Sequence, residues 1–133
     1  MYLIDTNVAI ELRDANPAVA VRVTALESRP RLSLLTLVEL EGGVYSRPEL
    51  AQPRRVALDA LIGRLTVEAF DARVVAAYGR IVAACGFSRP RILDRLIAAT
   101  AIVNDLTLIT INGDDFADIP GLKLEIWPAP AAQ

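Results

Sequence analysis

Short β-prone runs alternate with longer helical segments along this chain, and this alternation is its strongest constraint on the fold. The runs that we expect to form strands are residues 2–4, 31–35, 65–70, 106–111 and 122–127. Strands separated by helical segments favour a parallel sheet with helices on both faces, so we predict an α/β fold. In an open sheet of this kind, ligands bind beyond the carboxyl ends of the strands.

Capping residues and helix breakers delimit the helical segments. Asp5, Asn16 and Asp71 have side chains suited to capping the helices that follow them, and Pro48 stops the helix that opens at Thr36. The helices that we expect are residues 6–13, 17–26, 36–45, 51–62, 72–85 and 92–104. A basic loop at 88–91 and a turn at 112–115 separate the later elements.

The length of 133 residues is typical of one domain, and we expect residues 1–133 to form it, with 128–133 as a frayed tail. Hydrophobic residues make up 53% of the chain, which indicates a well-filled interior rather than disorder. No apolar stretch approaches the roughly 18 residues that span a bilayer, and the N-terminus lacks a signal-peptide pattern. We therefore expect no membrane association and a cytoplasmic location.

The sequence contains no histidine and one cysteine, so any catalysis must rest on carboxylates, with or without a metal that they hold. Cys85 lies in a helical segment and is expected to pack as a small buried hydrophobic residue. Zinc is disfavoured because its usual cysteine and histidine ligands are missing. A carboxylate site suits oxygen-binding cations such as Mg²⁺ or Mn²⁺.

Arginine accounts for 13 of the 14 basic residues, and Lys123 is the only lysine. Arginine binds phosphate through two parallel hydrogen bonds, which suits nucleic acid. The net charge is −2, from 16 acidic and 14 basic residues. When the four acids discussed below are set aside, 12 acidic residues remain, fewer than the 14 basic ones. The arginines fit phosphate binding or a solvated surface equally well.

Four acidic residues interrupt apolar local patterns: Asp5, Glu39, Asp94 and Asp115. Asp5 follows the first expected strand, and Asp115 follows the strand at 106–111 after a short turn. Because the carboxyl ends of parallel strands meet at one edge of the sheet, we expect these two acids to lie close together.

Asp94 lies on the packing face of its expected helix. Its neighbours three, four and seven residues further on are apolar: Ile97, Ala98 and Ala101. A carboxylate there is costly to bury alone, so it needs a partner or a cation. A salt bridge to Arg91 or Arg95 is the simpler alternative.

The other acids have ordinary alternatives as well. Helical periodicity does not decide between Glu39 and Glu41, although the glycines at 42–43 indicate a close approach or a helix end near them. Residues 5–7 suit a helix cap, and the acids of residues 114–118 suit a turn.

Convergence of the four acids would require compensation. Two carboxylates about 4 Å apart repel by about 4 kcal/mol at an effective dielectric of about 20. A divalent cation removes this repulsion, polarises a phosphoryl oxygen and activates a water molecule, so a phosphodiester could be cleaved without histidine. Four acids are compatible with one or two metal ions.

Taken together, the motifs resemble those of PIN-domain ribonucleases, specifically the VapC-type toxins of bacterial type II toxin–antitoxin systems. The matching segments, in the family's order, are Leu3-Ile4-Asp5-Thr6-Asn7, Thr36-Leu37-Val38-Glu39-Leu40, Asp94-Arg95-Leu96-Ile97-Ala98 and Leu108-Ile109-Thr110-Ile111-Asn112-Gly113-Asp114-Asp115-Phe116. They extend over essentially the whole chain and are specific as a set.

The resemblance implies a PIN-like three-layer α/β/α domain with a mainly parallel central sheet, and Mg²⁺- or Mn²⁺-dependent cleavage of RNA. The site residues carried over are the metal-binding acids Asp5, Glu39, Asp94 and Asp115, together with Thr6 and Asn112. Thr6 would orient a water or a phosphate, and Asn112 would line the site. The family also implies a homodimer and inhibition by a cognate VapB-type antitoxin.

Some alternatives remain open. The fourth acid could be Asp114 or Asp115, or Asn112 could take its position, since some relatives have an acid there. A non-catalytic PIN-like module for dimerisation or binding would not need the acids. A phosphotransfer domain also places an aspartate after its first strand, but Asn7 and the late position of Lys123 disfavour it.

Overall fold

The structure is a computed structural model that describes residues 1–130. Residues 131–133, part of the tail that is expected to fray, lie outside the described residues. Residues 128–130, the described part of this tail, have no regular secondary structure.

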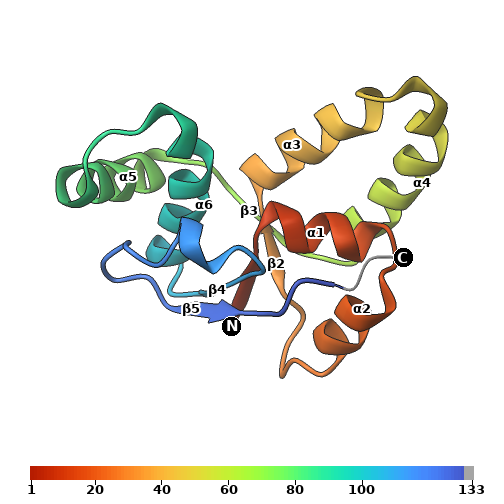
Figure 1. Cartoon of the computed structure of the whole chain (residues 1–133), viewed down its shortest axis with the longest axis horizontal. Helices are drawn as coiled ribbons and strands as arrows, with labels where there is room; N and C mark the ends of the chain where they lie inside the picture. Colours follow the sequence, from red (N-terminus) through yellow and green to blue (C-terminus); the bar gives the residue numbers. More distant parts are fainter. Residues whose placement is uncertain (131–133) are drawn as a thin grey trace.

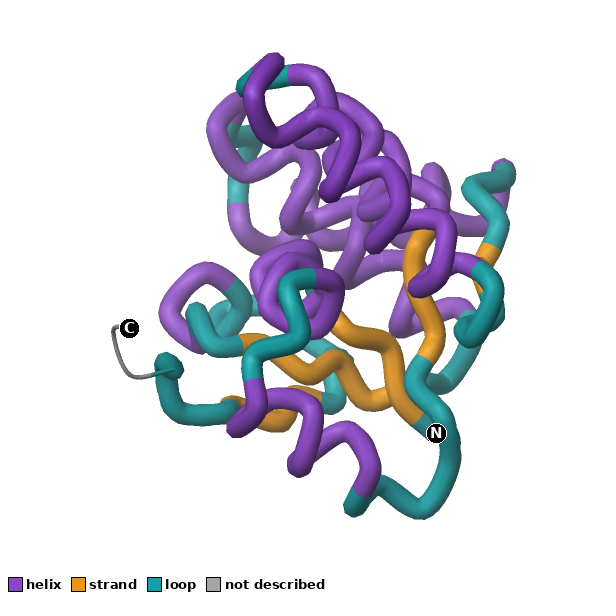
Figure 2. The backbone as a smooth tube through the Cα atoms, turned by 90° about the vertical axis from the view of Figure 1, so that its right-hand side faces the viewer, coloured by secondary structure: helices purple, strands orange, loops and turns teal. Residues whose placement is uncertain are grey.

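Five strands form one sheet in the order β3-β2-β1-β4-β5, and every pairing in it is parallel. The strands are β1 (Tyr2–Ile4), β2 (Arg31–Ser33), β3 (Val67–Glu68), β4 (Thr107–Thr110) and β5 (Leu124–Ile126). Figure 2 shows these short strands running side by side among the helices. The first strand of the chain is the central one, so the residue that follows it lies in the middle of the carboxyl edge.

Helices cover both faces of this sheet. They are α1 (Thr6–Arg13), α2 (Pro17–Thr24), α3 (Leu34–Tyr45), α4 (Ala51–Ile62), α5 (Ala72–Cys85) and α6 (Ile92–Val103). Figure 1 shows α5 and α6 on one side of the sheet and α1, α2 and α4 on the other. The α/β fold and its three-layer arrangement, both expected from the sequence, are therefore confirmed.

Alternate residues of the central strands enter the two halves of the core. Leu3 and Leu108 pack in the cluster beneath α5 and α6, whereas Ile4 and Ile109 pack beneath the helices of the opposite face. All four side chains are fully buried. Successive side chains of a strand point to opposite faces, so both helical layers hold the same two strands and fix where their carboxyl ends lie.

The second strand is shorter than expected. It ends at Ser33, whose hydroxyl group accepts a hydrogen bond from the backbone N–H of Leu35 at 3.0 Å and caps α3. The helix consequently begins at Leu34, two residues before Thr36. An apolar run of this length fits a buried strand or a buried helix equally well, and the serine cap decides.

Other boundaries also differ from the expected ones. The strand expected at 65–70 is only β3, which lies at the edge of the sheet and pairs with β2 alone. The strands expected at 106–111 and 122–127 are shortened at both ends, and α6 ends one residue before Asn104. The basic loop and the later turn form short 3₁₀-helices, η2 (Arg89–Arg91) and η3 (Gly113–Asp115), and a third, η1 (Pro48–Leu50), precedes α4. Within the described residues, no helix is long and apolar enough to cross a bilayer.

Candidate active site

Asp5 is the acid at the centre of the carboxyl edge. It follows β1 directly and is 3% exposed. One carboxylate oxygen, Oδ1, accepts from the backbone N–H of Val8 at 3.0 Å and so caps α1, while Oδ2 accepts from the Thr110 hydroxyl group at 2.5 Å. The helix cap that the sequence allowed is therefore observed, and it leaves this carboxylate at the carboxyl edge of the sheet, where the sequence also predicted a site acid.

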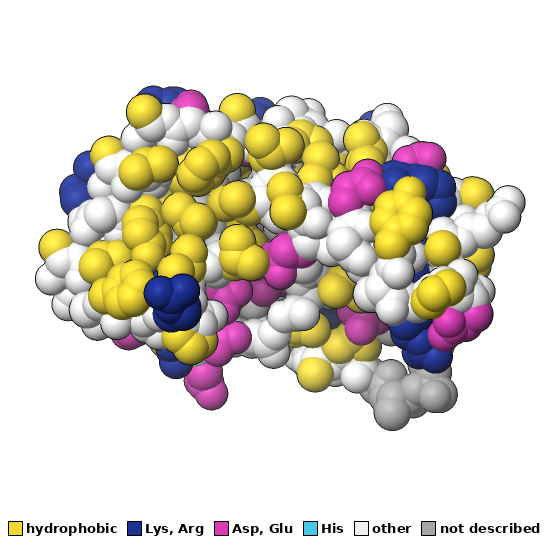
Figure 3. All heavy atoms as spheres, turned by 90° about the horizontal axis from the view of Figure 1, so that it is seen from above, with side chains coloured by type: hydrophobic (Ala, Val, Ile, Leu, Met, Phe, Trp, Pro, Cys, Tyr) yellow, Lys and Arg dark blue, Asp and Glu magenta, His cyan; other side chains and the backbone are white. Residues whose placement is uncertain are grey.

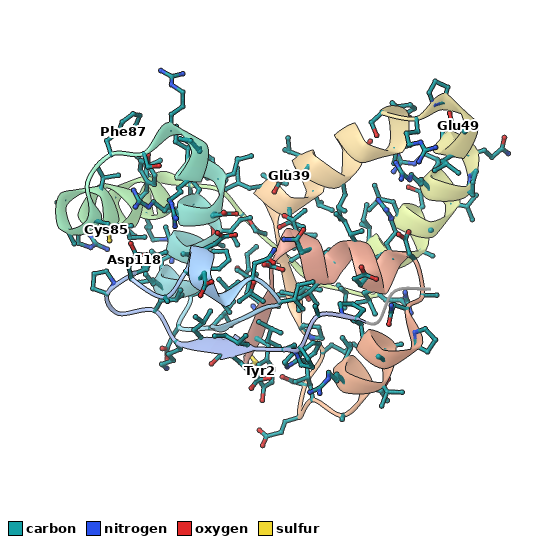
Figure 4. The ribbon with its side chains drawn as sticks, in the orientation of Figure 1. Tyr2, Glu39, Glu49, Cys85, Phe87 and Asp118 are labelled. Carbon is teal, nitrogen blue, oxygen red and sulfur yellow. The ribbon has the colours of Figure 1, made fainter. Side chains whose placement is uncertain are left out.

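Glu39 on α3 is tied to the start of α1. The Thr6 hydroxyl group donates to Oε1 of Glu39 at 2.6 Å and lies 3.1 Å from the hydroxyl oxygen of Thr36. Thr6 has a single hydroxyl proton, so Thr36 must be the donor in the second bond. Glu41 instead forms an exposed salt bridge with Arg55 at 2.8 Å. The structure therefore brings Glu39, and not Glu41, to the start of α1, and Figure 4 shows Glu39 on the part of α3 that approaches α1.

Asp94 lies half-buried in the first turn of α6, and its pKa is raised to about 6. Burial of the carboxyl group is the largest cause, followed by repulsion from Asp115, Glu39 and Asp5 in that order, with Arg91 acting in the opposite direction. Repulsion of this kind requires the charges to be near one another. The four acids selected from the sequence thus converge, although they come from four different parts of the chain.

The pKa of Asp5 is also raised. Burial is the largest cause, and repulsion from Glu39 adds to it, whereas the hydrogen bonds from Thr110 and from backbone N–H groups lower the pKa. Two of the four acids are therefore held where a negative charge is unfavourable without compensation.

Salt bridges do not supply this compensation. The Arg95 guanidinium donates to the backbone carbonyl of Gly86 at 2.5 Å, and Arg91 donates to the carbonyl of Asp115 at 3.5 Å. Neither forms the ion pair with Asp94 that the sequence allowed. Among residues 1–130, none of the four converging acids forms a salt bridge. Figure 3, which shows the molecule from above, has acidic side chains gathered in the middle of this face between two hydrophobic areas.

The loop after β4 contains the candidates for the fourth acid. Asp115 in η3 is half-buried and acts on Asp94, whereas Asp114 and Asn112 are exposed. The backbone N–H of Asn112 donates to the Thr110 hydroxyl oxygen at 2.9 Å, but its side-chain amide forms no hydrogen bond within the described part of the chain. The geometry therefore favours Asp115 over the other two.

The chemical type of the ligand atoms, carboxylate oxygen, suits a divalent cation. Four carboxylates converge without a basic partner, and carboxylate oxygens are the ligands that Mg²⁺ and Mn²⁺ prefer. As these side chains stand, no three acidic, cysteine or histidine residues within positions 1–130 have the spacing to hold a metal ion. A cation that neutralises the carboxylates would allow them to approach more closely.

Two buried threonines, Thr36 and Thr110, contribute to the site without having been selected from the sequence as site residues. Each is 0% exposed, and each places its hydroxyl group next to a site residue. The sequence feature that could have identified them is a polar residue inside an apolar run. Cys85 is only partly buried, contrary to expectation, and donates to the Asp118 carbonyl at 3.4 Å; Figure 4 shows both residues toward the α5 end of the molecule, away from Glu39.

Comparison with known proteins identifies this arrangement. The PIN domain profile matches residues 2–122. The chain belongs to the PIN-domain family. This membership confirms the family resemblance found in the sequence, and it removes the phosphotransfer alternative.

Relatives of this PIN domain match it along nearly the whole length. "Ribonuclease VapC2" of Rickettsia felis is 29% identical, with 96% of this chain and 98% of the relative covered. The "tRNA(fMet)-specific endonuclease VapC" of Salmonella typhimurium is also 29% identical, with 95% and 97% covered.

Solved structures show the same fold in complexes. The VapBC2 structure from Rickettsia felis, bound to a DNA fragment from its promoter, has a TM-score of 0.82 at 28% identity and covers 95% of this chain and 98% of that one. The DNA-bound VapBC structure from Salmonella typhimurium has a TM-score of 0.83 at 27% identity, with 95% and 97% covered.

Proposed function

We propose that this chain, as a single PIN domain over residues 1–133, is a Mg²⁺- or Mn²⁺-dependent endoribonuclease that acts as the toxin of a toxin–antitoxin pair. The observation that carries the proposal is the convergence of four carboxylates that have no salt-bridge partner in the described structure. The names of the relatives support RNA as the substrate class. One of them is specific for a transfer RNA, so transfer RNA is the first substrate to test.

The residues that would hold the cation are Asp5, Glu39, Asp94 and Asp115. When bound, the cation would stabilise negative charge on the phosphoryl oxygens and make a water molecule a better nucleophile at neutral pH. The protein holds Asp5 through Val8 and Thr110, and it holds Glu39 through Thr6. These hydrogen bonds limit how far Asp5 and Glu39 can move when the cation and the substrate bind.

Thr6 and Asn112 complete the proposed site in different ways. The only hydroxyl proton of Thr6 is directed to Glu39, so we assign Thr6 to orienting this carboxylate rather than a phosphate. Asn112 lies exposed at the start of η3, where its amide can contact a bound RNA.

RNA cleavage by the purified protein with Mg²⁺ or Mn²⁺ tests the proposal. We expect the Asp5→Asn variant to lose activity by about 100-fold or more, because a lost ligand should matter more than the outer contacts of a metal site. Asp114→Asn, which removes an exposed carboxylate of the same loop, is the matched control and should remain active. Undiminished cleavage in EDTA, or by Asp5→Asn, would contradict the assignment.

We further propose a cognate VapB-type antitoxin as partner, since the similar solved structures are VapBC complexes. The product of a small gene adjacent to this one should then co-purify with the chain and suppress its nuclease activity. Co-expression of the two genes without complex formation or suppression would argue against this pairing. A cytoplasmic location remains a prediction.

A homodimer is the proposed assembly. Leu34 and Val38 on α3 and Leu93 on α6 are 41%, 63% and 42% exposed, and these two helices contact each other. A second copy of the chain could cover these side chains and remove them from water. Light scattering should show a dimer for the wild type and a monomer for Val38→Lys; a monomeric wild type would exclude the assembly.

The alternative is a non-catalytic PIN-like module for dimerisation or binding. It is favoured by the spacing of the acids, which do not form a ready metal site in the described structure. Calorimetric titration with Mn²⁺ separates the two functions. Binding that is lost in Asp5→Asn supports the nuclease, and absence of binding to the wild type supports the module.

A further inference from the structure

We propose that Thr110 is a positioning residue whose buried hydroxyl group holds Asp5 and the loop that carries Asp115 in one arrangement. Thr110 is the last residue of β4 and is 0% exposed. The inference rests on the proposed nuclease function, since it concerns the residues that would hold the cation.

The two hydrogen bonds of Thr110 have fixed directions. Its hydroxyl group lies 2.5 Å from Oδ2 of Asp5 and 2.9 Å from the backbone nitrogen of Asn112. The Asn112 N–H can only donate, so the Thr110 oxygen accepts from it and gives its single proton to the carboxylate. A bond to an ionised acceptor is stronger than one between neutral groups.

The remaining contacts of Asp5 show why this hydroxyl group matters. Oδ1 is taken by the Val8 N–H, and the backbone N–H of Asp5 donates to the Ile109 carbonyl at 3.0 Å. The carboxylate is thus held by α1 on one side and by β4 on the other. Without the hydroxyl group, Oδ2 would lose its donor from β4, and the carboxylate would be held only by the backbone N–H groups of Asn7 and Val8 in α1.

The same hydroxyl group anchors the loop. Asn112 precedes η3, and its carbonyl accepts from the backbone N–H of Asp115 at 3.1 Å. A shift of Asn112 is therefore passed directly to Asp115. Loss of one hydroxyl group would disturb two of the four acids, and it would leave a carboxylate oxygen and an N–H group without these partners.

Another buried threonine provides a matched control. Thr100 on α6 is 1% exposed, and its hydroxyl group donates to the Leu96 carbonyl of the same helix at 2.9 Å. Thr100→Val removes the same atoms from the interior as Thr110→Val does. It breaks only a local bond, whereas the Thr110 bond to Asp5 joins residues 105 positions apart.

The experiment compares Thr110→Val, Thr110→Ser and Thr100→Val in the full chain. Mn²⁺ affinity is measured from the electron paramagnetic resonance signal of the free ion, and exchange of the Asn112 amide proton is followed by nuclear magnetic resonance without metal. We expect Thr110→Val to weaken Mn²⁺ binding by about 10–100-fold, the range for partners that orient metal ligands. We also expect it to accelerate exchange at Asn112. Thr110→Ser should restore both properties, and Thr100→Val should change neither.

Two results would overturn the proposal. The first is a Thr110→Val variant that binds Mn²⁺ as tightly as the wild type and keeps the Asn112 amide protected from exchange. The second is an equal loss of Mn²⁺ affinity in Thr110→Val and Thr100→Val. If Thr110→Val does not fold, Thr110→Cys carries the test, because its thiol is a weaker donor and should give an intermediate loss. A Cys variant identical to the wild type would then refute the role. A wild type that neither binds Mn²⁺ nor cleaves RNA would contradict the proposed function instead, while amide exchange would still report on the contact between Thr110 and the loop.

Discussion

Asp94 carries its charge under less favourable conditions in the folded protein than in the unfolded chain. Its pKa is about 6 in the fold, against an ordinary value of 3.8. The folded state therefore binds more protons than the unfolded state between these two pH values. The contribution of Asp94 to the stability of the metal-free protein should consequently fall as the pH rises through this window and level off above it.

Replacing this carboxylate should stabilise the metal-free protein. We expect Asp94→Asn to melt a few degrees higher than the wild type at pH 7.5 in EDTA, and the difference to shrink at pH 5. The side chain is only half-buried, so solvent screens part of the repulsion and the gain should be about 1 kcal/mol or less. Thermal melting at both pH values measures it, with Asp114→Asn as the exposed control. A lower melting temperature for Asp94→Asn at pH 7.5 would show that the acids do not strain one another.

We expect Glu39 and Glu41, both on α3, to differ in function. Glu39→Gln should lose RNA cleavage by about 100-fold or more, since it removes a proposed ligand. Glu41→Gln should remain active and lose only its exposed salt bridge to Arg55, and an exposed pair of this kind contributes little to stability. Cleavage rates and urea unfolding of both variants test this, and similar loss of activity in the two would remove Glu39 from the site.

At the scale of the elements, local signals predicted more than non-local ones. Asp5 could be placed because an apolar run and a capping residue are adjacent in the sequence. The roles of Thr36 and Thr110 could not, because their partners Thr6 and Asp5 lie 30 and 105 positions away. Helical periodicity could not separate Glu39 from Glu41 for the same reason, because the contact that distinguishes them comes from Thr6 on another helix. Only the family resemblance selected Glu39.

Strand ends were predicted less well than strand existence. An apolar run shows that a segment is buried, but it does not show where pairing stops. The second strand stops where Ser33 caps α3, and the pairing of β3 with the end of β2 extends only over Val67 and Glu68. Both limits depend on tertiary structure.

The contact between η3 and β5 gives a prediction at this scale. A Cβ atom on Gly113 would clash with Cδ1 of Ile126, so Gly113→Ala must displace either the loop or this side chain. Ile126 is 59% exposed and can yield in part, so we expect a loss of about 1 kcal/mol and a several-fold drop in cleavage through Asp115. Urea unfolding and RNA cleavage should show that Ile126→Ala relieves both effects. If Gly113→Ala reduced stability and cleavage equally with isoleucine and with alanine at position 126, the contact would not position the loop.

For the whole molecule, cation binding should be measurable as stability. A ligand that binds only the folded state adds about 2.7 kcal/mol at 100 times its dissociation constant. We therefore expect Mn²⁺ to raise the melting temperature of the wild type and of Asp114→Asn, but not of Asp5→Asn. EDTA should reverse the shift. An equal shift in Asp5→Asn would place the cation elsewhere on the molecule.

The central position of β1 has a consequence during synthesis. Tyr2 aligns with Thr107 in the sheet, and Asp5 depends on a hydroxyl group 105 positions later. Translation therefore produces the first acid 105 residues before the hydroxyl group that supports it. A nascent chain that has not yet reached Thr110 lacks this support for Asp5, so the proposed site can assemble only after most of the described domain has been synthesised.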